Sequence, residues 1–318
     1  MTTTKIALDV HAHLAPVDTA RLAEIAGVEW TAEQSRLKVD GHVIGIDALY
    51  SPQSLISWMD EQGIEQAWVS VPPPLYRAHL DEDSARAWCA YLNDTLEGIC
   101  IKHRGRLEPL RHLPLEHPAL ALEIARASGG KRYAAAAGGY EGTLSDEAYE
   151  TLWQTLDRQQ AFLFLHPGHC CDPRLAKFYL ENLMGNPLET AVAAAHLAFG
   201  GVATRHPRIR FCLAHGGGAS AMLAGRYERG YQTKRPGVDL SLPSPRTAFR
   251  GLFVDCIAHD AQALALSASV FGSTKILFGS DWPFPMGLPK PHEQLADVDP
   301  ELLNSIRIEN SRLLLEDE

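Results

Sequence analysis

The first apolar run of the chain ends in two histidines separated by one residue. The run reads I-A-L-D-V-H-A-H over residues 6–13 and has the length of a β-strand. Side chains alternate along a strand, so His11 and His13 point to the same side. Two imidazoles on one side supply half of a site for a divalent metal such as zinc or manganese. The pair also occurs in ordinary strands, so its meaning depends on the other strands.

Three later apolar runs end in residues that could complete such a site. The run at 161–165 is followed by His166, the run at 209–214 by His215, and the run at 276–280 by Asp281. Three imidazoles and one carboxylate suit a catalytic mononuclear metal site, where a fourth histidine and the aspartate can handle protons. Taken singly, each histidine also fits a turn or core position, and Asp281 fits a helix cap. Their shared position at strand ends favours the metal site.

Other polar residues near these runs have simpler structural interpretations. The three glycines after His215 allow a tight turn and free backbone N–H groups for an anion. Arg226 could bind a carboxylate at two points, although a solvated helix arginine is the simpler interpretation from the sequence alone. The residues placed outside the site are His169, His196, His206, His259, Cys170 and Cys171.

Apolar strands alternate with amphipathic helices from residue 52 onward, which indicates a parallel sheet covered on both faces. Eight strand–helix units predict a (β/α)8 barrel of the TIM type, whose sites lie at the C-terminal ends of the strands. An open doubly wound sheet is the competing layout, but no G-x-G-x-x-G follows any strand. The expected strands are 6–13, 66–71, 107–110, 132–137, 161–165, 209–214, 251–256 and 275–278. The expected helices are 52–62, 81–103, 118–128, 146–159, 187–205, one containing Arg226, and 260–271.

The stretch from about residue 14 to 51 interrupts this alternation. It has little helical periodicity, and the short runs 37–39 and 42–44 flank the hairpin-type pair Asp40-Gly41. We therefore predict one domain over residues 1–318, with a small inserted β-hairpin or sheet near the N-terminus and a helical segment at the C-terminus.

Composition and charge exclude several classes of protein. The 318 residues are 46% hydrophobic with a formal net charge of −10, which argues against a nucleic-acid-binding surface. Six scattered cysteines without a C-x-x-C pair predict a reduced, cytoplasmic protein without a disulfide framework. Neither a secretion signal nor an apolar run of membrane-spanning length is evident, so we expect no membrane association.

Several motifs of the chain resemble the amidohydrolase superfamily, and most closely its 2-amino-3-carboxymuconate-6-semialdehyde decarboxylase family. The similarity runs from the first strand to the C-terminus and is dense between Phe178 and Arg235 and around Asp281. The motifs are D-V-H-A-H, the H-P after the fifth strand, L-M-G-N-P-L-E-T-A-V-A-A-A-H-L-A-F-G-G-V, A-H-G-G-G, G-R-Y-E-R-G and F-G-S-D-W-P-F-P-M-G.

The resemblance implies a (β/α)8 barrel, one zinc ion (with manganese as the alternative) and no organic cofactor. His215 matches the family's catalytic histidine. Arg226 matches an arginine that binds substrate carboxylate from the partner subunit, so a homodimer is implied. A bridged two-metal site is not expected, because the fourth strand end carries no lysine. The residues matching the metal ligands are His11, His13, His166 and Asp281.

One departure from the family pattern concerns the substrate. The family carries a second substrate-binding arginine a few residues after an Asp-Gly pair in the insertion, whereas residues 40–46 here contain none. Arg77, after the second strand, could replace it. The departure disfavours the muconate semialdehyde itself and favours a related ring or diene acid, such as a hydroxybenzoate or hydroxypicolinate.

These observations predict a metal-dependent, non-oxidative decarboxylase of a small aromatic or unsaturated carboxylic acid. In that reaction His215 and Asp281 would handle protons, while Arg226 would orient the carboxylate. Two alternatives stay open. The same site could hydrolyse a lactone or amide or hydrate an unsaturated acid, or the barrel could have lost activity and serve as a binding partner.

Overall fold

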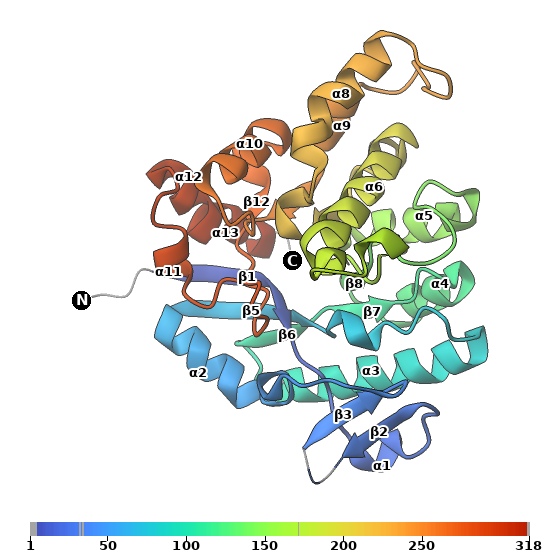
Figure 1. The fold of residues 1–318 in the computed structure, drawn as a ribbon, viewed down its shortest axis with the longest axis vertical. Coiled ribbons are helices and arrows are strands. Elements are labelled where there is room, and N and C mark those ends of the chain that lie inside the picture. Colours follow the sequence, from blue (N-terminus) through green and yellow to red (C-terminus); the bar gives the residue numbers. More distant parts are fainter. Residues whose placement is uncertain (1–4, 32, 34, 171, 317–318) are drawn as a thin grey trace.

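The computed structural model describes residues 5–31, 33, 35–170 and 172–316, and within these residues parallel strands form a closed barrel surrounded by helices (Figure 1). The barrel is a (β/α)8 barrel, as the alternating sequence pattern predicts. The barrel strands are β1 (Ile6–His13), β5 (Ile64–Ser70), β6 (Leu107–Pro109), β7 (Arg111–Leu113), β8 (Arg132–Ala136), β9 (Phe162–His166), β10 (Arg210–Leu213), β11 (Phe253–Asp255) and β12 (Ile276–Leu277).

The strands pair in two sets that close on each other. One set has the order β1-β5-β6 and the other β12-β11-β10-β9-β8-β7. The third barrel strand is shared between the sets: β6 pairs with β5, and β7 pairs with β8. At the other junction, the N–H of Val10 donates to the carbonyl of Phe278 and that of His13 to Trp282. The barrel is therefore continuous, and its first and last strands lie side by side.

The third strand differs from the single run expected at 107–110. It is interrupted at Leu110, whose N–H donates to Val69 of β5 while the next residue, Arg111, begins β7 and pairs with β8. Pro109 has no N–H to offer a sheet, which favours a break at this position.

Helices cover the outside of the barrel and follow the expected order, with shifted ends. The expected helix at 187–205 is divided by Gly200 and Gly201, and Gly201 has φ +68°, which ends a regular helix. The helices are α1 (Thr19–Leu22), α2 (Pro52–Gln62), α3 (Glu82–Lys102), α4 (Pro118–Ala127), α5 (Glu150–Gln159), α6 (Asn186–Phe199), α7 (Val202–Arg205), α8 (Ser220–Gln232), α9 (Pro245–Phe249), α10 (Ala261–Phe271), α11 (Pro291–Gln294), α12 (Pro300–Asn304) and α13 (Asn310–Glu316).

Two hydrophobic cores hold these layers together. One lies between the barrel and its helices, and the other fills the barrel with alternating side chains such as Val10, Trp68, Phe162 and Phe164. Leu314 of α13 belongs to the inner core, so the C-terminal helix covers the end of the barrel opposite the carboxyl ends of the strands. In the described part of the chain, no helix is long and apolar enough to cross a membrane.

The predicted insertion contains a small antiparallel sheet that lies apart from the barrel (Figure 1). Its strands are β2 (Val28–Thr31), β3 (Arg36–Val39) and β4 (His42–Val43). The turn between β3 and β4 falls at Asp40-Gly41, where both residues have positive φ, as the sequence predicts.

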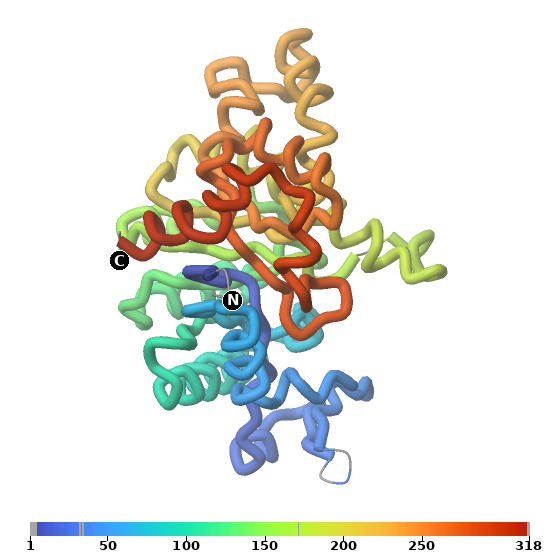
Figure 2. Tube along the Cα trace, turned by 90° about the vertical axis from the view of Figure 1, so that its left-hand side faces the viewer, coloured from blue at the N-terminus to red at the C-terminus, as the bar shows by residue number. Residues whose placement is uncertain are grey.

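Two further parts extend away from the barrel. The stretch between β9 and α6, which includes the short helical turn Glu181–Gly185, projects sideways (Figure 2), and α8 and α9 extend at the end opposite the small sheet (Figure 1).

An ion pair between a buried arginine and a partly exposed aspartate connects the small sheet to the barrel. Arg77, after β5, donates to both carboxylate oxygens of Asp40 at 2.7 and 2.8 Å and to the carbonyl of Ala26 at 2.9 Å. The Arg77 side chain is only 4% exposed, so its charge depends on this partner. The hydrogen bond from Arg77 lowers the pKa of Asp40 below its ordinary value.

We expect Asp40→Asn to destabilise the protein by about 2 kcal/mol, because it leaves a buried guanidinium without its carboxylate. The lowered pKa of Asp40 means that this contribution is present at neutral pH and is lost as the pH falls through that lowered pKa. Urea unfolding at pH 7 and at acidic pH measures both effects. Asp47→Asn is the control, because its pair with Arg36 in the same insertion is exposed. Equal midpoints for the two variants at pH 7 would contradict the prediction.

Candidate metal centre and active site

Four buried side chains converge at the carboxyl ends of strands 1, 5 and 8 of the barrel. His11 and His13 come from β1, His166 ends β9, and Asp281 follows β12. The Nε2 atoms of His11 and His13 are 3.1 Å apart, and each lies 3.2 Å from Oδ1 of Asp281. One candidate ligand atom from each of the four residues lies within 4.8 Å of the others. These are the four residues that match the family's metal ligands.

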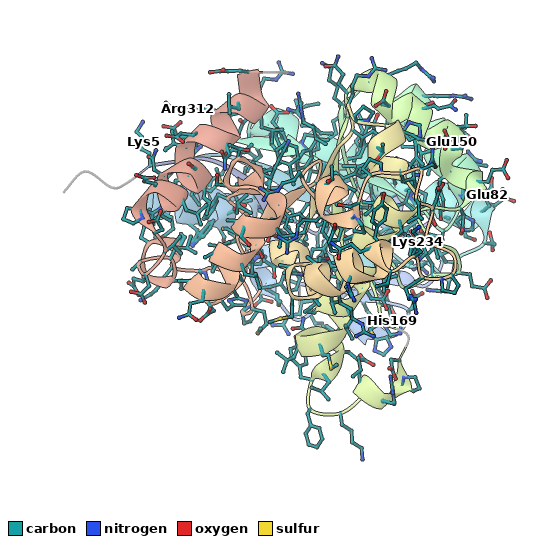
Figure 3. The ribbon with its side chains drawn as sticks, turned by 90° about the horizontal axis from the view of Figure 1, so that it is seen from above. Lys5, Glu82, Glu150, His169, Lys234 and Arg312 are labelled. Atoms are coloured by element: carbon teal, nitrogen blue, oxygen red, sulfur yellow. The ribbon has the colours of Figure 1, made fainter. Side chains whose placement is uncertain are left out.

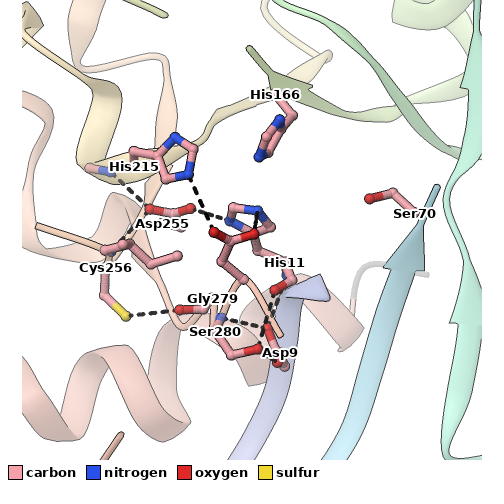
Figure 4. A network of polar contacts seen from close by, with 12 residues as sticks. Asp9, His11, Ser70, His166, His215, Asp255, Cys256, Gly279 and Ser280 are labelled. Carbon is pink, nitrogen blue, oxygen red and sulfur yellow. Dashed lines mark hydrogen bonds and ion pairs between the residues drawn. The ribbon is translucent and has the colours of Figure 1, made fainter. Parts of the chain in front are cut away.

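The outer nitrogens of the imidazoles are hydrogen-bonded, which orients the inner nitrogens. Nδ1 of His11 lies 2.7 Å from Oδ2 of Asp255 (Figure 4). Nδ1 of His166 lies 2.8 Å from the carbonyl oxygen of Pro167, and Nδ1 of His13 lies 3.1 Å from Oγ of Ser70. A carboxylate and a carbonyl can only accept, so His11 and His166 carry a proton on Nδ1. When they are neutral, these rings direct an Nε2 lone pair at the cluster, as a metal ligand must.

The cluster fits a divalent cation, because its internal hydrogen bonds leave two of its atoms without a partner in the described part of the chain. Within the described residues, neither Nε2 of His166 nor Oδ1 of Asp281 has a hydrogen-bond partner, although both atoms are buried. Unpaired buried polar atoms are costly, and several acceptors facing one point need a cation or protons. Three imidazoles and one carboxylate form a donor set typical of zinc or manganese.

The pKa values of the cluster residues reflect their burial and their closeness to one another. Burial, together with the neighbouring histidine charges, lowers the pKa of His166 well below its ordinary value, and burial lowers that of His13. Burial opposes ionisation of Asp281, but the charge of His11 and the close approach of the histidine nitrogens outweigh it and lower the pKa well below its usual range. Burial also opposes a charge on His11, yet Asp281 and Asp255 raise its pKa to about 10. Without a cation, a proton on His11 therefore balances the two carboxylates.

His215 lies beside the cluster without joining it. Its Nε2 is 3.8 Å from Oδ2 of Asp281, and its ring centroid is 5.0 Å from that of His166. Its side chain is 18% exposed, so it faces both the ligands and the space above them. Both His215 and Asp281 have φ near +57°, a strained conformation for residues with a Cβ. The loops at the ends of strands 6 and 8 hold these residues in place.

A cavity of about 990 Å³ opens above the cluster. His166, His215 and Asp281 form part of its floor, and Phe284, whose ring stacks edge-on against His13 at 5.4 Å, forms part of its wall. Among the described residues that line the cavity there is neither lysine nor arginine. The remaining apolar lining includes Leu175, Tyr179, Leu183, Ala221, Met222, Ile257, Ala263, Leu266 and Met286.

The two candidate substrate arginines lie outside this lining. Arg226 is exposed on α8, one helical turn beyond Met222 at the cavity mouth. Arg77 borders a second cavity of about 610 Å³ and is engaged with Asp40. Their roles in substrate binding stay predictions.

The residues placed outside the site divide into two groups. His196 bonds Ser145 and His206 bonds Glu150, which are structural contacts. The others line the cavity without reaching the cluster, and His169 lies at the base of the projecting segment (Figure 3); they are His169, His259 and Cys170. Cys171 lies outside the described residues.

Two buried carboxylates were missed from the sequence. Asp255 at the end of β11 holds His11, and Asp9 in β1 accepts from the N–H groups of His11 and Ser280 and from the hydroxyl of Ser280. Burial raises the pKa of Asp9 to about 7. β11 ends at Asp255, one residue before the end of the strand expected at 251–256, so the sequence places Cys256 at that strand end instead.

The fold and this cluster define the class: a (β/α)8 barrel with a histidine–aspartate site at the carboxyl ends of its strands. The amidohydrolase family model matches residues 8–316, so the chain belongs to the amidohydrolase family.

Similar proteins include 2-amino-3-carboxymuconate-6-semialdehyde decarboxylase from Dictyostelium discoideum, which is 25% identical over 92% of this chain and 85% of its own length. Gamma-resorcylate decarboxylase from Rhodococcus jostii is 26% identical over 88% of each chain. A dihydroxybenzoic acid decarboxylase from Polaromonas, solved with manganese and 2-nitroresorcinol, superposes with a TM-score of 0.76 at 18% identity, covering 98% of this chain and 97% of that one.

We expect apparent metal affinity to rise about tenfold per pH unit between pH 6 and 8 if one proton leaves on binding. His11 supplies that proton. Its raised pKa keeps the ring protonated in this range until a cation displaces the proton. Competition with a chromophoric chelator at several pH values measures the slope. A slope of zero would contradict the prediction.

We expect His166→Ala to lower metal content from one ion per chain to a small fraction of it, because it removes a candidate ligand atom, Nε2, that has no hydrogen-bond partner among the described residues. His196→Ala is the control, since that histidine is partly buried on the outer helix α6, where it bonds Ser145 away from the cluster. Metal analysis of purified proteins compares them, and equal metal content in both variants would contradict the assigned ligand set.

Proposed function

We propose that the protein is a metal-dependent, non-oxidative decarboxylase of a small aromatic or unsaturated carboxylic acid. The observation that carries the proposal is the buried cluster of His11, His13, His166 and Asp281 with His215 beside it, at the floor of a largely apolar cavity. Two relatives that match most of the chain are named as decarboxylases of a carboxymuconate semialdehyde and of gamma-resorcylate. Residues 42–46, directly after Asp40-Gly41, contain no arginine, so we favour a ring acid such as a hydroxybenzoate over the muconate semialdehyde.

The reaction breaks the bond between the carboxylate carbon and the carbon that bears it. Carbon dioxide leaves, the bonding electron pair stays on the substrate carbon, and a proton replaces the carboxylate. A divalent metal at the cluster would act as a Lewis acid toward a substrate oxygen. His215 delivers the proton, because it borders the cavity and lies beside the ionised Asp281, which steadies its charge as the proton moves.

We propose zinc as the metal, with manganese as the alternative. Both accept imidazole and carboxylate ligands, and the similar decarboxylase from Polaromonas is described with manganese. No organic cofactor is needed, because the substrate itself accepts the electron pair. A cytoplasmic location stays a prediction, supported by five described cysteines that are unpaired and buried.

We also propose that the protein acts as a homodimer and that Arg226 binds the substrate carboxylate across the interface. An exposed apolar surface near the cavity mouth supports the dimer, because large exposed patches mark interaction sites. Phe178 is 83% exposed and Met222 is 77% exposed, and Tyr179, Leu183, Met184 and Val192 are exposed hydrophobic residues as well. The cavity has no cation among its described lining residues, so an arginine from a second copy would complete it.

We expect one divalent ion per chain and carbon dioxide release from at least one member of a panel of hydroxybenzoates, hydroxypicolinates and aminomuconate semialdehydes. His215→Ala should lower kcat by about 10²–10⁴-fold while leaving metal content unchanged, since it removes the proton donor and no ligand. Release of an alcohol, amine or ring-opened acid instead of carbon dioxide would replace this proposal with a hydrolase or hydratase.

We expect an equal mixture of Arg226→Ala and His215→Ala subunits, refolded or exchanged together, to recover about a quarter of wild-type activity. Half of the dimers are then mixed, and each mixed dimer holds one site with both residues intact. Activity assays on the mixture, with each variant alone as the control, test this. Recovery would fail if Arg226 served its own subunit's site.

A further inference from the structure

Asp255 lies fully buried between the metal cluster and the loop that carries His215. Its Oδ2 lies 2.7 Å from Nδ1 of His11. Its Oδ1 accepts from the N–H of Gly216 at 2.8 Å and from the N–H of Ile257 at 3.0 Å. One carboxylate thus touches a candidate metal ligand with one oxygen and the residue that follows His215 with the other (Figure 4).

The bond to His11 decides which nitrogen of that ring can bind a metal. An ionised carboxylate accepts but does not donate, so the proton of neutral His11 sits on Nδ1 and the lone pair on Nε2. Nε2 is the atom that faces His13 and Asp281. A group that donated to Nδ1 would favour the opposite tautomer, with an N–H pointing into the cluster.

The bond to Gly216 fixes the strained turn that holds His215. His215 has φ +56° and Gly216 φ +63°, so the chain needs outside support to keep this shape. Two side chains hydrogen-bond to the backbone of Gly216. Asp255 accepts from its N–H, and the hydroxyl of Ser267 on α10 donates to its carbonyl at 3.1 Å. Of these two side chains, only Asp255 also bonds His11.

We propose that Asp255 is a positioning residue that couples metal binding at His11 to the placement of His215. It acts through both residues and does not line the cavity where substrate would bind. The inference rests on the proposed metal site, and it predicts that the metal and the His215 loop stabilise each other.

The test compares Asp255→Asn with Ser267→Ala as a matched control. The asparagine can keep an oxygen for the N–H groups of Gly216 and Ile257, but its amide N–H₂ then meets Nδ1 of His11 and favours the wrong tautomer. We expect its dissociation constant for Mn²⁺ or Zn²⁺, measured by chelator competition, to rise about 10–100-fold. Ser267→Ala loosens the same glycine but leaves the bond to His11 intact, so its dissociation constant should rise far less than that of Asp255→Asn.

A second measurement tests, without any substrate, whether metal binding stabilises the loop that carries His215. In the wild type, adding Mn²⁺ should slow hydrogen exchange at the amides of Gly216 and Ile257, and in Asp255→Asn it should not. Asp255→Glu restores an acceptor-only group and should recover part of the lost affinity, which separates the tautomer effect from general loss of packing. Circular dichroism establishes that each variant is folded. If Asp255→Asn does not fold, the metal affinity of Asp255→Glu is compared with that of the wild type instead.

Unchanged metal affinity in Asp255→Asn, or wild-type exchange rates that ignore the metal, would overturn the coupling. These readouts do not depend on the reaction. A wild-type protein that binds metal but releases no carbon dioxide would overturn the proposed decarboxylation while leaving the coupling intact.

Discussion

The central constraint in this molecule is that several buried electron-pair donors face one another at the end of the barrel. The Nε2 atoms of His11 and His13 and Oδ1 of Asp281 lie about as close as hydrogen-bonded atoms, yet no arrangement of protons satisfies all of them and Nε2 of His166 as well. Such an arrangement is tolerated only if a positive charge sits among them. The protein therefore carries either a cation or an extra proton at this point, and the lowered pKa of Asp281 expresses the same requirement.

The barrel keeps these donors together because their backbones belong to its strands or to the turns directly after them. Paired strands cannot drift apart to relieve the repulsion, and residues in strained turns are held by bonds to neighbouring strands. Asp9 ties strand 1 to strand 8 through Ser280, while Asp255 ties strand 7 to strand 1 through His11. Cohesion between strands at this end thus depends on buried carboxylates as well as on the backbone ladder.

The sequence predicted the barrel and the metal cluster because both follow from periodic patterns. Apolar runs of strand length ending in His166, His215 and Asp281 are visible in one dimension, and the barrel topology brings such ends to one rim. The interruption at Leu110 and the division of the expected helix at Gly200 are weaker signals, since tertiary packing decides where a pattern stops. Asp255 was missed because a single acid at a strand end has no partner in the sequence; its partner, His11, is more than 240 positions away.

The role of Arg77 illustrates a different limit. The sequence shows a cation near a strand end, but it cannot show whether that cation already has a counterion. In the structure the carboxylate of Asp40 from the inserted sheet already binds the guanidinium of Arg77, so a substrate carboxylate would have to compete with it. Only the three-dimensional contacts reveal this. The sequence likewise indicated that His169 and His259 are not ligands, yet the way they border the cavity depends on how distant loops pack.

Gly279 shows how little space this arrangement leaves. It lies where the chain of strand 8 passes between His11 and Asp255, and a methyl group there would approach the Cβ atoms of these two residues to 2.8 and 2.9 Å. The hydrogen bond between the imidazole and the carboxylate therefore spans a gap only as wide as bare backbone allows. A metal site of this design transplanted to another barrel would have to carry this glycine with it, although glycine contributes no ligand and no charge.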